Sequence, residues 1–180
     1  MCAKRIVQLG NVGDDAAGCT NAVETIRAAR SNPGIEIIGI SLREFQPPEG
    51  LFRQIRAEFI KGLDHIEDGS ADVVESDMSL GFYDSRGHRL TDQSQYPKTK
   101  EYMQMVFKKA FKKLKPGGEF RMSCTKPFND LEFLTPALTS AGFKSENIQV
   151  REFEENEYDK TRWTKLARRQ MYLYQVTATK

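Results

Sequence analysis

Cysteine and histidine are scarce in this sequence. Its 180 residues include three cysteines (Cys2, Cys19 and Cys124) and two histidines. The cysteines are odd in number and form no CxxC pair, so the sequence predicts neither a disulfide framework nor a zinc site, and no metal is expected. Chains with so few cysteines are usually reduced, which favours a cytoplasmic location.

Long hydrophobic runs and a large net charge are absent as well. No apolar stretch of the sequence approaches the roughly 20 residues that a helix needs to span a bilayer, so we expect no membrane partner. The formal net charge is only +2, although 29% of the residues are charged, and this near balance does not by itself predict a polyanionic partner. A length of 180 residues predicts a single domain over 1–180 with a sizeable core.

Short apolar runs typical of strands alternate along most of the chain with segments whose apolar residues recur at helical spacing. This alternation predicts an α/β domain with a largely parallel sheet, and two late strands joined only by a loop predict an antiparallel pair at one edge. Residues 76–97 form a long, polar, turn-rich segment. A loop of this length in a compact domain is usually functional or disordered. Strands are predicted at 5–9, 35–40, 71–75, 119–123, 148–153 and 171–178, and helices up to about residue 30, at 50–61, from about 99 to 115, and at 129–141.

The segment 106–122 carries the most specific pattern. Val106, Ala110, Phe111 and Leu114 recur at helical spacing, which predicts one buried helix face. The motif L-K-P-G-G, which begins at Leu114, is expected to end this helix because proline cannot extend it and glycine permits the turn. A strand at 119–123 is predicted to follow directly.

The loop after the first predicted strand is rich in glycine. Gly10 follows the strand, and Gly13 comes three residues later. Glycines let a backbone approach a nucleotide-like ligand, and the next helix offers unpaired N–H groups at its N-terminus, so the arrangement predicts a ligand site. An ordinary turn, with Asp14 or Asp15 capping the helix, explains the same residues equally well.

Several segments together resemble the class I S-adenosylmethionine-dependent methyltransferases. Besides the glycine loop, they are N-P-G-I-E-I-I-G-I at 32–40, D-G-S-A-D-V-V at 68–74 and L-K-P-G-G at 114–118, in an order that covers about 5–178. The resemblance implies a Rossmann-like three-layer sandwich with a mostly parallel seven-stranded sheet and an antiparallel edge strand. It also implies S-adenosylmethionine as the cofactor and methyl transfer as the activity.

Three positions depart from that family. Gln8 stands in place of the acid that precedes the glycines, and Asp14 stands in place of the third glycine. Ser41 stands where nucleotide-type folds place a carboxylate that binds the ribose hydroxyls. These departures support a second hypothesis, a methyltransferase-like domain that has lost the cofactor and acts through a protein partner or as a homodimer. A Rossmann-like domain with a different nucleotide ligand is a third.

A narrower resemblance is to bacterial tRNA (guanine-N7) methyltransferases. The run 32–40, the segment Y-P-K at 96–98 and the segment T-K-L-A-R-R at 164–169 are similar in place to segments of that family. They imply an RNA substrate, and the lysines of 98–115 are expected to contribute to a basic rim. Those lysines are equally explained as the solvated face of a helix. Ala167 replaces a glutamate of that family and its D-P-W-P-K motif is missing, so a small-molecule acceptor remains an alternative.

The candidate site residues follow from the rule that open α/β sheets bind ligands at the carboxyl ends of their strands. Asp77 is the candidate catalytic residue, because a carboxylate there can orient or deprotonate a substrate amine or hydroxyl. Asp64 is a candidate contact of the adenine amino group, or else a loop acid without a ligand. The candidate cofactor-binding residues are Gln8, Gly10, Asn11, Gly13, Ser41, Leu42, Asp64 and Asp77, and the candidate substrate-binding residues are Met78, Ser79, Phe82, Tyr83, Lys98, Thr164 and Lys165.

Overall fold

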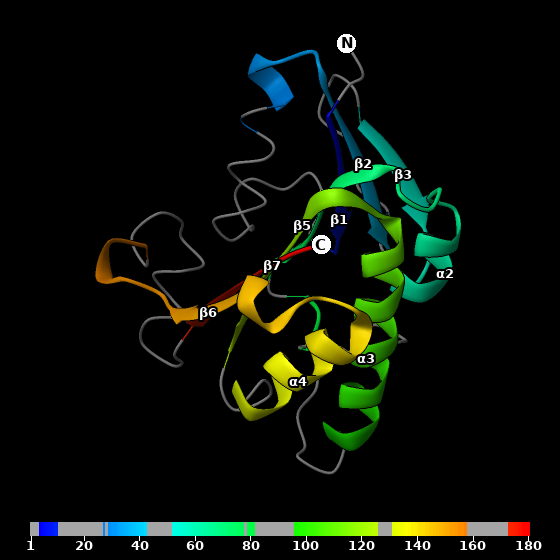
Figure 1. Ribbon diagram of the computed structural model, residues 1–180. Coiled ribbons are helices and arrows are strands. Elements are labelled where there is room, and N and C mark those ends of the chain that lie inside the picture. The colour runs from blue at the N-terminus through cyan, green and yellow to red at the C-terminus, as the bar shows by residue number, and fades with distance from the viewer. Residues whose placement is uncertain are drawn as a thin grey trace.

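A seven-stranded sheet forms the centre of the protein, with the strand order β3-β2-β1-β4-β5-β7-β6 (Figure 1). The computed structural model describes residues 4–10, 27, 29–42, 52–77, 79–81, 96–125, 131–157 and 173–180. The strands are β1 (Lys4–Leu9), β2 (Ile35–Ser41), β3 (Phe52–Arg56), β4 (Ala71–Asp77), β5 (Leu114–Thr125), β6 (Ile148–Glu152) and β7 (Leu173–Thr179). The helices are α2 (Phe59–Asp64), α3 (Tyr96–Lys113) and α4 (Leu131–Ala141), with short 3-10 turns η2 (Ser145–Asn147) and η3 (Glu155–Glu157).

The direction of the strands confirms the predicted fold class. Strands β3, β2, β1, β4 and β5 pair in parallel, and β7 pairs antiparallel with both β5 and β6. The antiparallel pair predicted from the two late strands is therefore present at one edge of the sheet, with β7 between β5 and β6. The strand order reverses between the neighbours β1 and β4, because the chain builds β1, β2 and β3 outward on one side and then passes from β3 to β4 on the other side of β1.

The helix predicted at 50–61 is wrong. The chain forms the edge strand β3 at Phe52–Arg56, paired in parallel with β2, and the helix α2 begins only at Phe59. Glu58 sets that start, because its carboxylate accepts hydrogen bonds from the backbone N–H groups of Ile60 at 2.9 Å and Lys61 at 2.7 Å. An edge strand has one neighbour and several half-exposed side chains, so its composition gives a weak strand pattern.

The L-K-P-G-G motif also behaves differently from the prediction. Helix α3 ends at Lys113, and β5 begins at Leu114 rather than at Glu119. Ala71 pairs with Leu114 while Val73 pairs with Glu119, so the proline and glycines are accommodated as an irregularity within the ladder. Gly117 has a φ of 75°, a conformation that favours glycine and allows the local bend.

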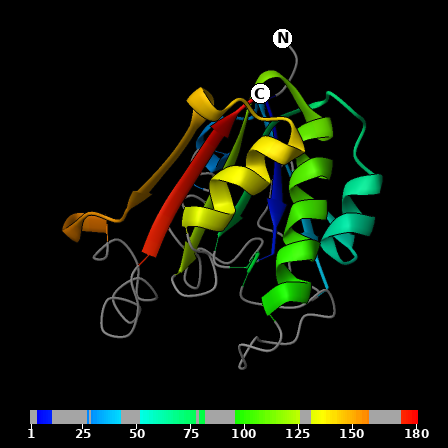
Figure 2. The same cartoon turned by 60° about the horizontal axis from the view of Figure 1, so that its bottom comes forward.

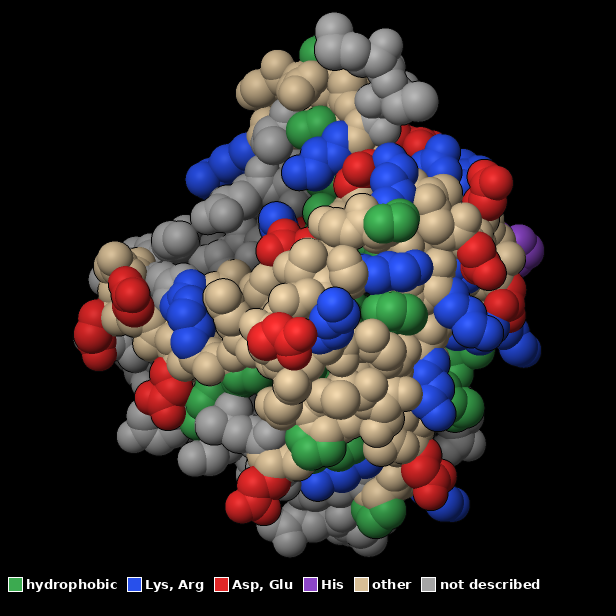
Figure 3. Space-filling model, viewed as in Figure 1, with side chains coloured by type: hydrophobic (Ala, Val, Ile, Leu, Met, Phe, Trp, Pro, Cys, Tyr) green, Lys and Arg blue, Asp and Glu red, His purple; other side chains and the backbone are tan. Residues whose placement is uncertain are grey.

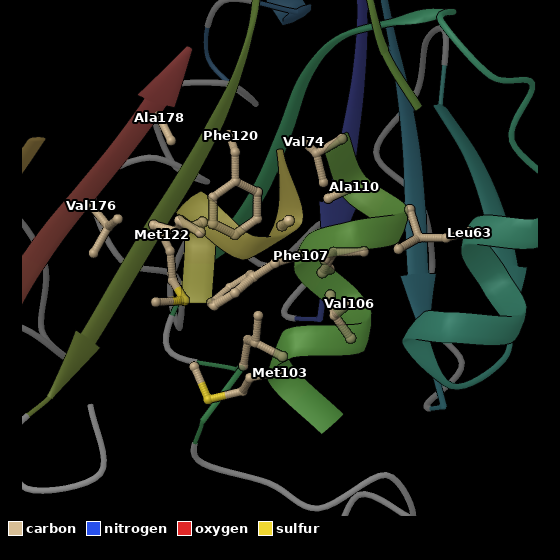
Figure 4. Close-up of a cluster of buried hydrophobic side chains, with 14 of the residues drawn as sticks. Leu63, Val74, Met103, Val106, Phe107, Ala110, Phe120, Met122, Val176 and Ala178 are labelled. Atoms are coloured by element: carbon tan, nitrogen blue, oxygen red, sulfur yellow. The ribbon is translucent and has the colours of Figure 1, made fainter. Parts of the chain in front are cut away.

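The main core lies between the sheet and the helices α2, α3 and α4, which cover the same face (Figure 2). Phe107 of α3 meets Phe120 of β5 edge to face, with ring centroids 5.4 Å apart, and both are fully buried (Figure 4). Val106 and Ala110 of α3 are also fully buried, which confirms the helix face predicted from their spacing. A smaller apolar cluster lies on the other face and consists of Ile6, Ile35, Ile37 and Val73, with Ala29 against it. In the part of the chain that the structure describes, no helix has the length and hydropathy required to cross a bilayer.

Three ion pairs join α3 and the start of β5 to the segment that leads into β4. Asp64 pairs with Lys109, Asp68 with Lys113 at 2.5 Å, and Asp72 with Lys115 at 2.8 Å. Hydrogen bonds from their lysines hold the pKa values of Asp64 and Asp68 below the usual range. Burial alone would raise the pKa of Asp72, but hydrogen bonds from Lys115 and from a backbone N–H outweigh it and lower that pKa as well.

These ion pairs predict a loss of stability in acid. A carboxyl group whose pKa is lower in the folded protein than in the unfolded chain stabilises the fold above its unfolded pKa, and that contribution disappears as the pH falls through the folded pKa. The free energy of unfolding is therefore expected to fall with pH below about 4, and less steeply in Asp72→Asn. The ion pair of Asp72 with Lys115 is partly exposed. Its contribution to the free energy of unfolding is therefore less than about 1 kcal/mol and weakens with salt. Urea unfolding between pH 2 and 6 at two salt concentrations measures it, and identical pH profiles for the variant and the wild type would contradict it.

Candidate functional site

Buried polar residues gather at the carboxyl ends of the strands. The described part of the chain buries nine polar or charged residues, and only Lys113 lies away from this edge. The others stand near the ends of β1, β2, β4 and β5, in the turn after β4, or in the first turn of α3 (Gln8, Ser41, Glu75, Ser76, Asp77, Ser79, Thr99 and Ser123). Burying polar groups is costly unless they are hydrogen-bonded or serve a ligand, so this edge is the candidate site.

Gln8 and Glu75 form a buried pair across β1 and β4. They are direct neighbours in the parallel ladder, and the side-chain Nε2 of Gln8 donates a 2.7 Å hydrogen bond to Oε1 of Glu75. Gln8 is 2% exposed and Glu75 1%. The amide oxygen of Gln8, Oε1, is buried and has no hydrogen-bond partner. The sequence analysis placed Gln8 in the site but missed Glu75, whose charge directly after the apolar pair Val73 and Val74 was the available signal.

Asp77 lies at the end of β4, where the sequence analysis placed it, and is held by Ser123 of β5. The hydroxyl of Ser123 donates a 2.7 Å hydrogen bond to Oδ1 of Asp77, and both residues are buried. The two residues are direct partners in the β4–β5 ladder. Because side chains alternate between the faces of a strand, Glu75 and Asp77 share one face of β4. Ser123 was not singled out from the sequence.

Gly10 ends β1 in a conformation that favours glycine. Its φ is 77°, and its N–H donates a 2.8 Å hydrogen bond to the carbonyl of Ile40 in β2. A Cβ atom at this position would lie 2.1 Å from Oγ of Ser79. Ser79 follows β4, and its hydroxyl donates a 3.2 Å hydrogen bond to the carbonyl of Asp77. The loop after β1 therefore contacts the loop after β4 across the point where the strand order reverses.

Leu42 and Ser41 occupy the end of β2. Ser41 is buried, whereas 42% of Leu42 is exposed. Among the described residues only Met105 on α3 is another large hydrophobic side chain with such exposure. An exposed apolar side chain at the carboxyl edge fits a flat, apolar ligand group such as a purine.

Phe59 lies near this edge as well, at the start of α2. A Cβ placed on Gly10 would lie 3.5 Å from Cζ of Phe59. The ring of Phe59 stacks on that of Tyr102, with the ring centroids 6.5 Å apart. Burial, with a hydrogen bond to Glu58, raises the pKa of Tyr102, so its hydroxyl stays protonated and donates to Glu58 at 2.8 Å. The sequence analysis did not single out these residues.

Asp64 lies at the far end of α2 from this edge. Helix α2 starts after the carboxyl end of β3 and returns toward the start of β4, and Asp64 is its last residue, paired with Lys109. The structure therefore does not bring Asp64 to the other site residues, since a helix that packs back on a sheet carries its last turn away from the strand ends. Lys98 is exposed in the first turn of α3. The predicted residues Asn11, Gly13, Met78, Phe82, Tyr83, Thr164 and Lys165 lie outside the described residues.

Two lysines of α3 form ion pairs within the chain, whereas Lys98, Lys108 and Lys112 are exposed. Lys109 and Lys113 pair with Asp64 and Asp68, and Lys100 lies 5.0 Å from the ring centroid of Phe133. On the face that Figure 3 shows, Lys and Arg side chains are interspersed with Asp and Glu. A nucleic acid that used Lys109 and Lys113 would have to displace their ion pairs, which lowers the net electrostatic gain from these two residues.

Cys124 has no role in the chemistry of this edge. It follows Ser123 in β5 and is fully buried, and burial raises the pKa of its thiol to about 12. The reactive form of cysteine is the thiolate, which is scarce at neutral pH under these conditions. The packing role expected from the sequence for this residue agrees with its position in the main core.

Solved structures of methyltransferases share this architecture. No protein-family model matches the sequence, and no curated protein matches it. A SAM-dependent methyltransferase from Archaeoglobus fulgidus superposes with a TM-score of 0.59 at 15% identity, covering 99% of this chain and 86% of the other. An S-adenosylmethionine-dependent methyltransferase from Mesorhizobium loti gives 0.61 at 16% identity, covering 98% and 90%.

A third similar structure is a larger protein. Phosphoethanolamine N-methyltransferase 2 from Haemonchus contortus, in complex with S-adenosyl-L-methionine, gives a TM-score of 0.59 at 14% identity. The match covers 99% of this chain and 49% of that protein, so this chain spans about half its length. Together with the strand order and the antiparallel β7, these similarities show that the chain has the fold of the class I S-adenosylmethionine-dependent methyltransferases.

Proposed function

We propose that the protein is an S-adenosylmethionine-dependent methyltransferase that acts on a small molecule. The observation that carries this proposal is the concentration of buried polar residues at the carboxyl edge of a methyltransferase fold. Packing alone does not require polar side chains there, because the strands of a covered parallel sheet are normally apolar. A ligand that contacts this edge would explain why they are retained.

The described residues fit the cofactor in part. Gly10 gives the backbone a close approach at the end of β1, Leu42 offers an apolar surface to the adenine, and the hydroxyl of Ser41 stands at the ribose position. When bound, the cofactor supplies an electrophilic methyl group on a sulfonium. The chain's own task is then to position the acceptor and exclude water, and buried Asp77 is placed to hold the acceptor's proton.

A small acceptor is supported better than RNA. The lysines that the RNA hypothesis needs on α3 are partly neutralised by Asp64 and Asp68. Among the similar structures, the one from Haemonchus contortus acts on phosphoethanolamine, and another, from Burkholderia thailandensis, is a 1,6-didemethyltoxoflavin N1-methyltransferase. Both acceptors are small molecules.

A second candidate function is a methyltransferase-like domain without a cofactor, acting through a protein partner or as a homodimer. Two observations favour it. Ser41 supplies no carboxylate for the ribose, and Ser79 already occupies the space beside Gly10 that a ligand would approach. The two functions differ in whether a nucleoside ligand stabilises the fold.

Ser41→Asp is expected to tighten the binding of S-adenosylhomocysteine about tenfold. A carboxylate at the end of β2 accepts hydrogen bonds from two ribose hydroxyls, and a hydrogen bond to a charged group contributes about 1.5–3 kcal/mol. Ser140→Asp is the matched control, because it adds the same charge at an exposed position on α4. Calorimetric titration measures both variants, and equal affinity of Ser41→Asp and Ser140→Asp would contradict this placement of the ribose.

Thermal unfolding with a panel of nucleosides tests the proposed function itself. A ligand at about 100 times its dissociation constant stabilises the native state by about 2.7 kcal/mol. S-adenosylhomocysteine is expected to raise the unfolding midpoint, whereas NAD and ATP at the same concentration leave it unchanged. A rise with NAD or ATP alone would indicate a different nucleotide ligand. No rise with any of them would favour the cofactor-free domain.

A further inference from the structure

We propose that Tyr102 is a positioning residue of the candidate site, because its hydroxyl fixes the start of α2 and so holds the ring of Phe59 beside Gly10. The inference rests on the proposed function for the identity of the ligand, whereas the place of Phe59 does not depend on it. It brings α3, which lies beside α2 (Figure 1, Figure 2), into the ligand site.

The tip of the Phe59 ring reaches the end of β1. Its Cζ would lie 3.5 Å from a Cβ placed on Gly10, and the side chain is only partly buried against the main core. Leu42, at the end of the neighbouring strand β2, is also exposed. Apolar side chains at two adjacent strand ends offer contact area to a flat ring such as a purine.

Helix α2 cannot hold Phe59 in this place by itself. It has only six residues, Phe59–Asp64, and isolated helices shorter than about 12 residues are marginal in water. The position of its first residue therefore depends on contacts with other elements.

One such contact is made with the sheet. Gly62 lies three residues after Phe59, on the same face of α2. A Cβ on Gly62 would lie 2.1 Å from Cγ2 of Ile40, so the helix approaches β2 closely here. The carbonyl of Ile40 also accepts the 2.8 Å hydrogen bond from the N–H of Gly10. The residue against which α2 packs is thus the one that holds the end of β1.

Tyr102 supplies the second contact, at the first turn of α2. Its hydroxyl donates a 2.8 Å hydrogen bond to Oε2 of Glu58, the N-cap residue, and accepts one from the N–H of Phe59 at 3.2 Å. Its ring stacks on that of Phe59 with an interplanar angle of 28°. Tyr102 is 7% exposed, so water competes little for either hydrogen bond. One side chain of α3 therefore holds both the backbone and the ring of Phe59.

This arrangement prepares the edge before a ligand arrives. Without the hydroxyl, the N–H of Phe59 loses its acceptor and the cap residue Glu58 loses a donor. The first turn of α2 would then have to become ordered when the ligand binds, and ordering a segment on binding lowers the affinity.

Tyr102→Phe tests this role, because it removes the hydroxyl and keeps the ring. Calorimetric titration with S-adenosylhomocysteine is expected to show binding about three- to tenfold weaker than in the wild type. Tyr174→Phe is the matched control. The Tyr174 hydroxyl also donates to a carboxylate, that of Glu152 at 3.0 Å, but it lies on β7, three strands away from β1. Its affinity should stay within about twofold of the wild type, and unfolding midpoints show that both variants are folded.

A double-mutant cycle shows whether Tyr102 acts through Phe59. Phe59→Leu removes the ring and is expected to weaken binding on its own. In the Phe59→Leu protein, Tyr102→Phe should then change the affinity by no more than about twofold, because the group that it positions is already lost. A purely structural role of Tyr102 would give two independent factors that multiply. Such multiplied factors, or unchanged affinity in Tyr102→Phe, would overturn the proposal.

Hydrogen exchange at the backbone amide of Phe59, followed by NMR, tests the positioning without any ligand. The exchange is expected to be about fivefold faster or more in Tyr102→Phe and unchanged in Tyr174→Phe. If S-adenosylhomocysteine does not bind the wild type while this amide exchanges faster in Tyr102→Phe, the proposed function fails and the positioning of Phe59 stands. If the wild type and Tyr102→Phe bind it equally, the proposed function stands and the role of Tyr102 is wrong.

Discussion

Replacing Phe107 by alanine is expected to lower the free energy of unfolding by about 3–5 kcal/mol, the usual range for a buried phenylalanine. Phe107 lies at the centre of the core, fully buried, with its ring against that of Phe120 (Figure 4). This loss has three parts: the favourable free energy of burying the ring away from water, its edge-to-face contact with Phe120, and the cost of the cavity left behind. Small domains have about 5–15 kcal/mol in total, so the variant is expected to lie near the limit of folding.

Met105→Ala is the matched control for this measurement. Met105 is on the same helix, α3, two residues earlier, and half of its side chain is exposed. Its truncation is expected to change the free energy of unfolding by no more than about 0.5 kcal/mol. Urea unfolding followed by circular dichroism measures both variants. Similar midpoints for Phe107→Ala and Met105→Ala would show that α3 does not pack on the sheet as described.

Gly10→Ala is expected to be the most damaging single change at the carboxyl edge. A residue with a side chain costs about 1–2 kcal/mol in the left-handed conformation that Gly10 adopts. The new Cβ would also meet Oγ of Ser79 at 2.1 Å and its Cβ at 2.5 Å, and overpacking of this kind costs about 1–3 kcal/mol more. Both effects act where we place the ligand, so the affinity for S-adenosylhomocysteine should fall together with the stability.

Two further variants separate the two costs of Gly10→Ala. Gly69 has a similar φ of 68°, and nothing lies within 4 Å of a Cβ placed there, so Gly69→Ala measures the backbone cost alone. The double variant Gly10→Ala with Ser79→Gly removes the steric conflict and should recover the difference in a double-mutant cycle. If Gly10→Ala destabilises no more than Gly69→Ala, the contact between the loops after β1 and β4 is not as tight as the structure indicates.

Much of the fold could be predicted from the sequence because most of its strands are buried on both faces. The run that became β2 is largely apolar, those that became β1 and β4 each contain a short buried apolar stretch, and α3 has a clear apolar face. Strand β3 was missed because an edge strand is only partly covered and its arginines and glutamine give no strand pattern. The irregular start of β5 was missed because proline and glycine ordinarily terminate structure, and only the pairing with β4 shows that the ladder continues past them.

The site was predictable only where a residue stands next to a strand end. Gly10, Ser41, Leu42 and Asp77 lie at or next to the ends of strands, as that rule predicts. Glu75 and Ser123 were missed because they are brought to the candidate site by pairing with a neighbouring strand. The register that pairs them with Gln8 and Asp77 cannot be predicted from either segment alone. Asp64 lies at the end of α2, and the direction of that helix depends on the missed strand β3.

Calorimetric titration of the wild-type protein with S-adenosylhomocysteine tests the assignment of this edge most directly. We expect saturable binding of one molecule per chain, weakened at least about tenfold by Gly10→Ala, in line with 1.4 kcal/mol per tenfold change in affinity. Such a result would place the ligand at the end of β1 and justify a search for the methyl acceptor. The absence of heat at millimolar ligand, or binding that Gly10→Ala leaves unchanged, would contradict the assignment and favour a methyltransferase fold that works without the cofactor.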